Sequence, residues 1–248
     1  MSAELPEPQV LARAQLADLA ELVRTGPVDL GAFTQAEMAV VIGEVPALAG
    51  VQDAVLAEAV RSLAARGVLH RVPGEDSAEV VGDLGLLVAL VSTSTGTLDI
   101  RRGHDGPADA PWRWLVSLFA HGLVGVDRID ALGLHRLSLY SRKGVADQVA
   151  QRMIDGRARI PAGSADPVPI DEQQVRVLAT TAQARWQLVH RVPRRDSGSL
   201  VVVDSLVVRI DEARVDLITP APDSSGYERR TTDEAHLSDY LTGLFTVT

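Results

Sequence analysis

The chain has 248 residues, 46% hydrophobic and 23% charged, which excludes an intrinsically disordered protein and allows a large hydrophobic core. Its net charge of −9 and pI of about 5.1 argue against binding to the phosphate backbone of nucleic acids. The lack of cysteine excludes disulfides, thiolate zinc sites and cysteine nucleophiles, and it fits a reducing compartment.

Neither export nor membrane insertion is expected. Residues 1–8 are acidic and contain proline, whereas a secretory signal begins with basic residues and continues with an apolar core. The longest apolar run, Leu84 to Val91, is far shorter than the roughly 20 residues of a membrane helix. We therefore expect a cytoplasmic protein without a membrane-spanning segment.

Three helices are predicted before the first strand. Apolar residues at helical spacing predict an amphipathic helix over residues 9–24. The sequence Thr34-Gln35-Ala36-Glu37 has the form of a capping box and predicts a short helix that ends near Ile42. A further apolar stripe predicts a helix over residues 51–66, and a strand from Val68 to Val72 follows.

The rest of the first half is predicted to be an antiparallel meander that ends in a helix. Residues 79–91 are apolar at too many positions to distinguish helix from strand, and we favour helix. Residues 112–120 fit a helix or a buried strand, and their aromatic and branched side chains favour the strand. The other expected elements are a strand at 97–101, a loop at 104–111, strands at 123–129 and 134–140, and a helix at 144–154.

Residues 156–170 are rich in proline, glycine and aspartate and are predicted to be a linker between two halves. The second half is expected to begin with a helix at 171–184. Strands at 186–192, 200–210 and 214–219, a loop at 220–230 and a capping box at 231–234 should follow. A closing helix is predicted from its apolar stripe of Leu237, Tyr240, Leu241, Leu244 and Phe245.

Two nearly identical stretches, Leu69 to Ser77 and Val189 to Ser197, lie about half the chain length apart. They place His70 and His190 at equivalent positions on predicted strands. We interpret them as traces of a gene duplication that produced halves at 1–155 and 171–248. The predicted fold is a compact α+β unit with pseudo-twofold symmetry, in which helices flank a central antiparallel sheet.

No pattern in the sequence indicates catalysis. The histidines lack the spacing of a metal site, and His104-Asp105-Gly106, the most reactive-looking trio, lies in a predicted turn. The sequence contains no nucleophile elbow, phosphate-binding loop or dinucleotide-binding motif. We therefore predict a protein that is not an enzyme and that holds neither a metal nor a cofactor.

A DNA-binding function is the alternative. Residues 16–81 contain the three helices, strand and turn of a winged helix-turn-helix domain. Its third helix carries Asp53 and Glu58 as well as Arg61 and Arg66, so its charge is close to neutral. We therefore expect no binding to nucleic acid.

The chain resembles the EspG family of ESX (type VII) secretion-associated proteins from actinobacteria. The resemblance extends over nearly the whole chain as a pattern. The parts that carry it are the helix from Ala59 to Leu69, the segment from Gly82 to Leu90, the meander from Trp112 to Tyr140 with its following helix, Pro167 to Ile170, and Val203 to Ser205.

The resemblance implies a pseudo-twofold α+β fold and a cytosolic chaperone or adaptor that binds a helical secretion substrate of the PE–PPE or WXG type. Such a partner needs exposed apolar surface on a sheet face or beside a helical bundle. Trp186 and Leu188 on a strand and Tyr240 on the closing helix are the candidate partner-binding residues. The alternative is that Trp186 and Tyr240 belong to the hydrophobic core.

Overall fold

The structure is a computed structural model that describes residues 13–43, 53–74, 78–82, 84–85, 88, 94–103, 113–130, 132–154, 163–182, 184–193, 200–210, 214–222 and 226–246. The helices are α1 (Arg13–Thr25), α2 (Gln35–Val41), α3 (Ala54–Ala65), α5 (Arg142–Ile154), α6 (Glu172–Thr181) and α7 (Glu234–Leu244), with a 3₁₀ turn, η1, at Ala120–Gly122. None of these helices is long and apolar enough to cross a membrane.

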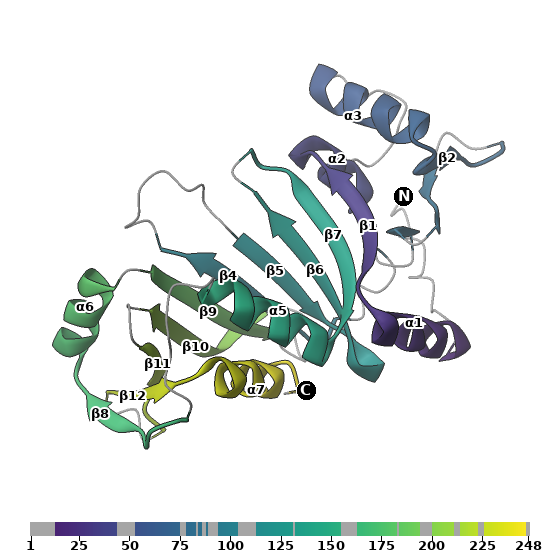
Figure 1. Cartoon of the computed structure of the whole chain (residues 1–248). Helices are drawn as coiled ribbons and strands as arrows, with labels where there is room; N and C mark the ends of the chain where they lie inside the picture. The colour runs from purple at the N-terminus through teal and green to yellow at the C-terminus, as the bar shows by residue number, and fades with distance from the viewer. Residues whose placement is uncertain are drawn as a thin grey trace.

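Most of the strands form one ten-stranded antiparallel sheet (Figure 1). They are β1 (Val28–Phe33), β4 (Gly96–Arg102), β5 (Arg113–Leu118), β6 (Leu123–Ile129), β7 (His135–Ser141), β8 (Val168–Ile170), β9 (Ala184–Pro193), β10 (Leu200–Ile210), β11 (Val215–Pro220) and β12 (Tyr227–Thr232). A separate two-stranded sheet pairs β2 (Leu69–Arg71) with β3 (Ala78–Val80). The predicted α+β class with a central antiparallel sheet is thus confirmed.

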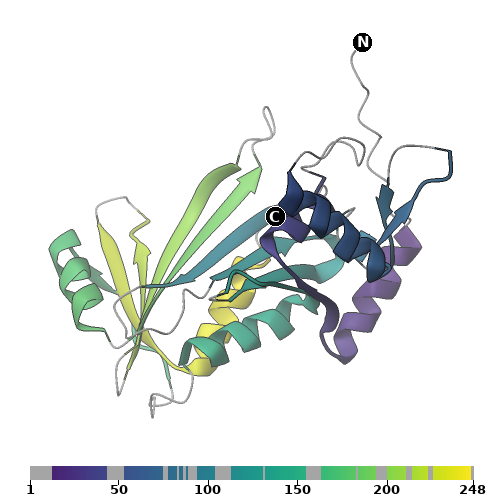
Figure 2. The ribbon, with the colours of Figure 1, turned by 90° about the horizontal axis from the view of Figure 1, so that it is seen from above.

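The two halves of the large sheet have the same strand order. From the central pair of β4 and β9, four consecutive strands run outward in each half, and the strand that opens the half takes the edge. The order is β4-β5-β6-β7-β1 on one side and β9-β10-β11-β12-β8 on the other. Each half then ends in a helix, α5 or α7, and the two helices pack side by side on one face of the sheet (Figure 2).

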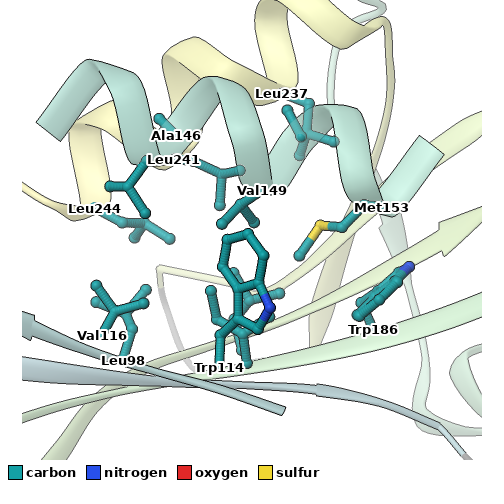
Figure 3. Close-up of a cluster of buried hydrophobic side chains, with 14 of the residues drawn as sticks. Leu98, Trp114, Val116, Ala146, Val149, Met153, Trp186, Leu237, Leu241 and Leu244 are labelled. Atoms are coloured by element: carbon teal, nitrogen blue, oxygen red, sulfur yellow. The ribbon is translucent and has the colours of Figure 1, made fainter. Parts of the chain in front are cut away.

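The register extends this likeness to single residues. Ile100 and Leu188 face each other at the central pair, and the neighbouring positions can be followed outward through both halves. The corresponding buried residues are Leu98, Val116 and Val126 in the first half, and Trp186, Val208 and Leu217 in the second. Their side chains meet those of α5 and α7 in the main core (Figure 3). The halves are therefore alike in order and in core residues, while their origin by duplication stays a prediction.

A second core lies on the opposite face, at the β1 end of the sheet. Helices α1, α2 and α3 bury apolar residues there against β6 and β7, among them Phe33, Leu63, Leu137 and Leu139. The predicted capping box is confirmed, because Thr34 Oγ accepts from the Glu37 backbone N–H and the Glu37 carboxylate accepts from that of Thr34.

The buried Glu37 carboxylate also joins α2 to α3. It accepts hydrogen bonds from Ser62 Oγ at 2.7 Å and from Arg66 Nη1 at 3.1 Å. Burial raises the pKa of Glu37, but the hydrogen bonds from Thr34 and Ser62 and the Arg66 charge outweigh it, and the net pKa is lowered. Glu37 thus stays ionised within the second core.

The repeated sequence that suggested duplication does not mark equivalent positions, which corrects that interpretation. Its first copy includes β2, in the small sheet, where His70 is exposed, whereas its second includes β9, at the centre of the large sheet, where His190 is buried. The register makes β4, not β2, the equivalent of β9. A short apolar run before a turn fits both settings, because local sequence does not specify the pairing partner.

Three predictions for residues 156–234 are also wrong. Residues 227–230 of the predicted loop and residues 231–232 of the predicted capping box form β12, whose outer neighbour is β8. Asp233, not Thr231, caps α7 and accepts from the His236 N–H, because the threonines before it are occupied in β12. The last three residues of the predicted linker form β8, an edge strand in which Pro169 lacks an N–H and so limits further pairing.

The other helices and strands of the large sheet agree with the sequence prediction, apart from β1, β8 and β12, which were missed. Residues 113–118 form a strand, which settles the choice left open for 112–120. Within 79–91, Glu79 and Val80 belong to β3, while the described residues Gly82, Leu84, Gly85 and Val88 are helical.

Candidate functional site

The centre of the large sheet has one covered and one partly open face. On the covered face, Leu98, Ile100 and Leu188 pack beneath α5 and α7. The opposite face is covered by α1 to α3 at its β1 end (Figure 2). Along β4, β5 and β9 this opposite face keeps partly exposed side chains, namely Thr97, Leu115, Ser117 and Val189. We call this region the open face.

A buried carboxylate surrounded by arginines lies on the open face. The side chain of Asp99 on β4 is only 2% exposed. Its carboxylate accepts hydrogen bonds from Nε and Nη2 of both Arg101 and Arg113. The bonds from Arg113 measure 2.9 Å each, and Arg191 Nη1 lies 3.6 Å away. We call these four residues the Asp99 cluster.

Strand geometry explains this convergence. Residues at alternate positions share a face, so Asp99 and Arg101 point away from the core that Leu98 and Ile100 enter. Arg113 faces Arg101 across β4 and β5, and Arg191 faces Thr97 across β4 and β9. Both arginines therefore reach the same carboxylate from neighbouring strands.

Asp99 remains ionised at neutral pH. Burial raises its pKa, but the hydrogen bonds and charges of Arg101 and Arg113 outweigh that effect and lower the pKa from 3.8 to about 2. Asp99 in turn raises the pKa of Arg101 through its hydrogen bond and charge. The cluster thus contains one negative and three positive charges.

A row of hydrogen-bonded polar side chains lies next to the Asp99 cluster, on the side of β7. Asp127 Oδ2 lies 2.7 Å from His135 Nδ1, and His135 Nε2 lies 2.7 Å from Gln35 Oε1 at the start of α2. Burial raises the pKa of Asp127 despite the hydrogen bond from His135 and the charges of His135 and Arg113. Asp127 and Asp99 therefore share Arg113 as a nearby charge but have opposite pKa shifts.

The geometry suits binding better than catalysis. The Asp99 carboxylate is buried and occupied by guanidinium groups, so it has no exposed oxygen with which to act as a base or nucleophile. The arginines remain partly open, with side-chain exposures of 53% for Arg101, 38% for Arg113 and 31% for Arg191. Guanidinium groups in this arrangement recognise carboxylates or phosphates.

The structure places two of the candidate partner-binding residues in the main core. Trp186 is 3% exposed and lies on the face of β9 that packs under α5 and α7 (Figure 3). Leu188, two residues along on the same face, is 1% exposed. Tyr240 is partly buried against the same core. Trp186 and Leu188 therefore present almost no surface to a partner, which corrects the prediction. Their neighbours Gln187 and Val189 point to the open face instead.

The winged-helix alternative has a partial counterpart in α2, α3 and the β2–β3 hairpin. However, β1, which lies between α1 and α2 within this region, pairs with β7 in the large sheet. On α3, Arg61 forms an ion pair with Glu58, and Arg66 binds Glu37 and the Ala32 carbonyl. The described surface of α3 thus offers little uncompensated positive charge for a DNA backbone.

The His104-Asp105-Gly106 trio that looked most reactive in the sequence stays untested. His104 and Asp105 lie outside the described residues. In the described part of the chain, no group of three His, Asp or Glu side chains is placed to hold a metal ion.

A pocket of about 550 Å³ lies at the far end of the sheet between β8, α6 and β12, lined by Ile170, Gln174 and Tyr227 among others. Its acidic lining residues are Asp171, which caps α6, and Glu228 of β12.

Sequence reasoning missed the Asp99 cluster, although a signal for part of it exists. Thr97, Asp99 and Arg101 alternate with Leu98 and Ile100, which indicates a strand with one polar face. The polar positions of a half-exposed strand are ordinary, and only the pairing of β4 with β5 and β9 brings the other two arginines to Asp99.

A comparison of the chain with models of protein families and with curated proteins finds no match to either.

Proposed function

We propose that this protein is a non-enzymatic chaperone or adaptor that resembles EspG and holds a helical type VII (ESX) secretion substrate in the cytosol. The proposal combines the resemblance of the sequence with one structural observation. The centre of a large antiparallel sheet is buried under α5 and α7 on one face and keeps partly exposed apolar and charged side chains on the other.

The open face has the character of a protein-binding surface. Leu115 and Val189 supply apolar contact area, and the Asp99 cluster between them supplies hydrogen-bond donors that fix orientation. Arginine is enriched among the residues that dominate protein interfaces. A helical hairpin tip laid across β4, β5 and β9 would contact both kinds of residue.

The test is co-expression with PE–PPE-like or WXG-type proteins encoded by the same organism, followed by affinity purification. The expected result is a stoichiometric complex. Failure to recover a complex with any ESX substrate of that organism would refute the proposed function.

A steric variant locates the binding face. Thr97→Trp places a bulky side chain on the open face, at a strand position that tolerates aromatic residues. We expect it to reduce recovery of the partner at least about tenfold, while the melting temperature stays unchanged. His70→Trp, at an exposed strand position of β2, is the matched control and should retain the complex. Equal recovery with both variants would exclude the open face.

A further inference from the structure

The arginines of the Asp99 cluster are held in place while part of their donor capacity stays unused by Asp99. Arg101 and Arg113 both bind Asp99 through Nε and Nη2, so the Nη1 group of each is not directed at that carboxylate. Among the hydrogen bonds of the described residues, none uses Nη1 of Arg101 or Arg113. Each guanidinium carries five N–H donors, so both can bind a further acceptor without leaving Asp99.

Charge on the open face also differs from that of the whole molecule. The chain has a net charge of −9, whereas the cluster combines three arginines with a single carboxylate. A surface of this kind attracts anionic groups and is screened by salt.

The fold itself does not require these charges. By the register, Asp99 and Arg101 correspond to Gln187 and Val189 in the second half, which builds the same ladder with two uncharged residues at these positions. Replacing a buried ion pair by neutral residues is often neutral or stabilising, so the cluster is not explained by stability alone.

We propose that the open face binds the acidic end of a helical protein partner. Carboxylates of the partner accept hydrogen bonds from Nη1 of Arg101 and Arg113 and from the guanidinium of Arg191, while Asp99 keeps the first two arginines oriented. Acidic residues concentrate in the first turn of helices, where they also favour the helix dipole, so the bound segment is a helix start. This inference rests on the proposed function and names the chemistry of its partner.

A protein fits better than a nucleic acid. The surplus charge is confined to three arginines around one point, and affinity for a nucleic acid depends on many phosphate contacts along a groove. The half-buried Leu115 and Val189 nearby provide apolar contacts that a phosphate backbone cannot use.

The experiment uses the full chain and two fluorescein-labelled, alanine-based helical peptides of about 20 residues, long enough to be helical in water. Each peptide has leucines on one face, and its first turn contains glutamates in one and glutamines in the other. Fluorescence anisotropy gives the Kd. NMR signals of the arginine Nε–H groups report the binding site, because Asp99 accepts hydrogen bonds from the Nε–H groups of Arg101 and Arg113. We expect tighter binding of the glutamate peptide, shifts of these signals and weaker binding at higher salt.

Arg101→Gln should raise the Kd of the glutamate peptide about tenfold, the effect of one charge-assisted hydrogen bond. Arg61→Gln on α3 removes the same charge from a distant exposed site and should leave the Kd unchanged. Equal affinity for the two peptides, no binding of either, or equal effects of the two substitutions would overturn the inference. If a short DNA duplex displaces the glutamate peptide and its own binding is weakened by Arg101→Gln, the partner is a nucleic acid and the inference is overturned.

The co-expression test separates this inference from the proposed function. A complex with an ESX substrate that forms equally well with Arg101→Gln refutes the acidic contact and leaves the function standing. Peptide binding that depends on Arg101 without any ESX complex supports the acidic contact and refutes the proposed function.

Discussion

The two faces of the central sheet obey different constraints. On the face under α5 and α7, equivalent positions of the two halves hold similar residues, as Val116 and Val208 do. On the opposite face, the equivalent positions differ in chemistry, with Asp99 matched by Gln187 and Asp127 by Ile218. Packing fixes apolar character in a core, whereas a partly open face permits residues that serve other purposes.

The largest expected effect concerns the covered face. Leu188→Ala removes a fully buried side chain and leaves a cavity beneath α5 and α7, so the free energy of unfolding should fall by about 3 kcal/mol. Urea denaturation measures the change. Val189→Ala, one residue along on the open face, should cost about 1 kcal/mol or less. Equal losses would show that the two faces are packed alike.

The next effect separates Asp99 from Asp127 on β6. Asp99 has a pKa lowered to about 2, so its ion pairs stabilise the protein above pH 3.8 and are lost as the pH falls toward 2. Asp99→Asn should therefore cost about 2 kcal/mol at pH 7, and the difference from the wild type should shrink over that interval. Denaturation curves at several pH values measure it.

Asp127 should change stability with pH in the opposite direction from Asp99. Its pKa is raised by burial, so ionisation costs stability at neutral pH, and this cost is relieved as the pH falls through the folded-state pKa. Asp127→Asn should remove the pH dependence of this cost. Parallel changes of stability with pH in the Asp99 and Asp127 variants would contradict the assigned shifts.

A smaller effect compares the starts of the two closing helices. Asp233 caps α7, and at the corresponding position after β7 the Ser141 Oγ accepts from the Gly144 N–H at the start of α5. Each alanine variant should cost about 1 kcal/mol. Burial raises the pKa of Asp233, but hydrogen bonds from the His236 and Gly163 N–H groups lower it to about 2, and the His236 side chain adds to this effect. Only the Asp233→Ala effect should therefore shrink between pH 3.8 and 2, as thermal denaturation would show.

The smallest effect lies far from both faces. The ion pair of Arg61 with Glu58 on α3 is exposed, so Arg61→Gln should change the free energy of unfolding by less than about 0.5 kcal/mol. A mobility-shift assay at low salt should show no DNA binding by either form. Tight binding that is sensitive to salt and weakened by this substitution would favour the winged-helix alternative.

Local signals in the sequence predicted most helices and central strands. The capping box at Thr34, the apolar stripe of α5 and the β-branched run of β10 each depend on neighbours in the chain. The short strands β1, β8 and β12 were missed, because each has six or fewer residues, and the two edge strands β1 and β8 pair with partners that are distant in sequence. The candidates Trp186 and Leu188 failed as surface residues because apolar periodicity does not tell which face of a strand is covered.

The sequence by itself determined the α+β class, the order of the main elements and the apolar residues available for a core, since these follow from periodicity, capping and composition. Only the tertiary structure decided which strands are equivalent, assigning β9 to β4 rather than to the repeated stretch at β2. It also decided that Arg113 and Arg191 meet at Asp99, because strand pairing joins residues whose separation along the chain carries no local signal.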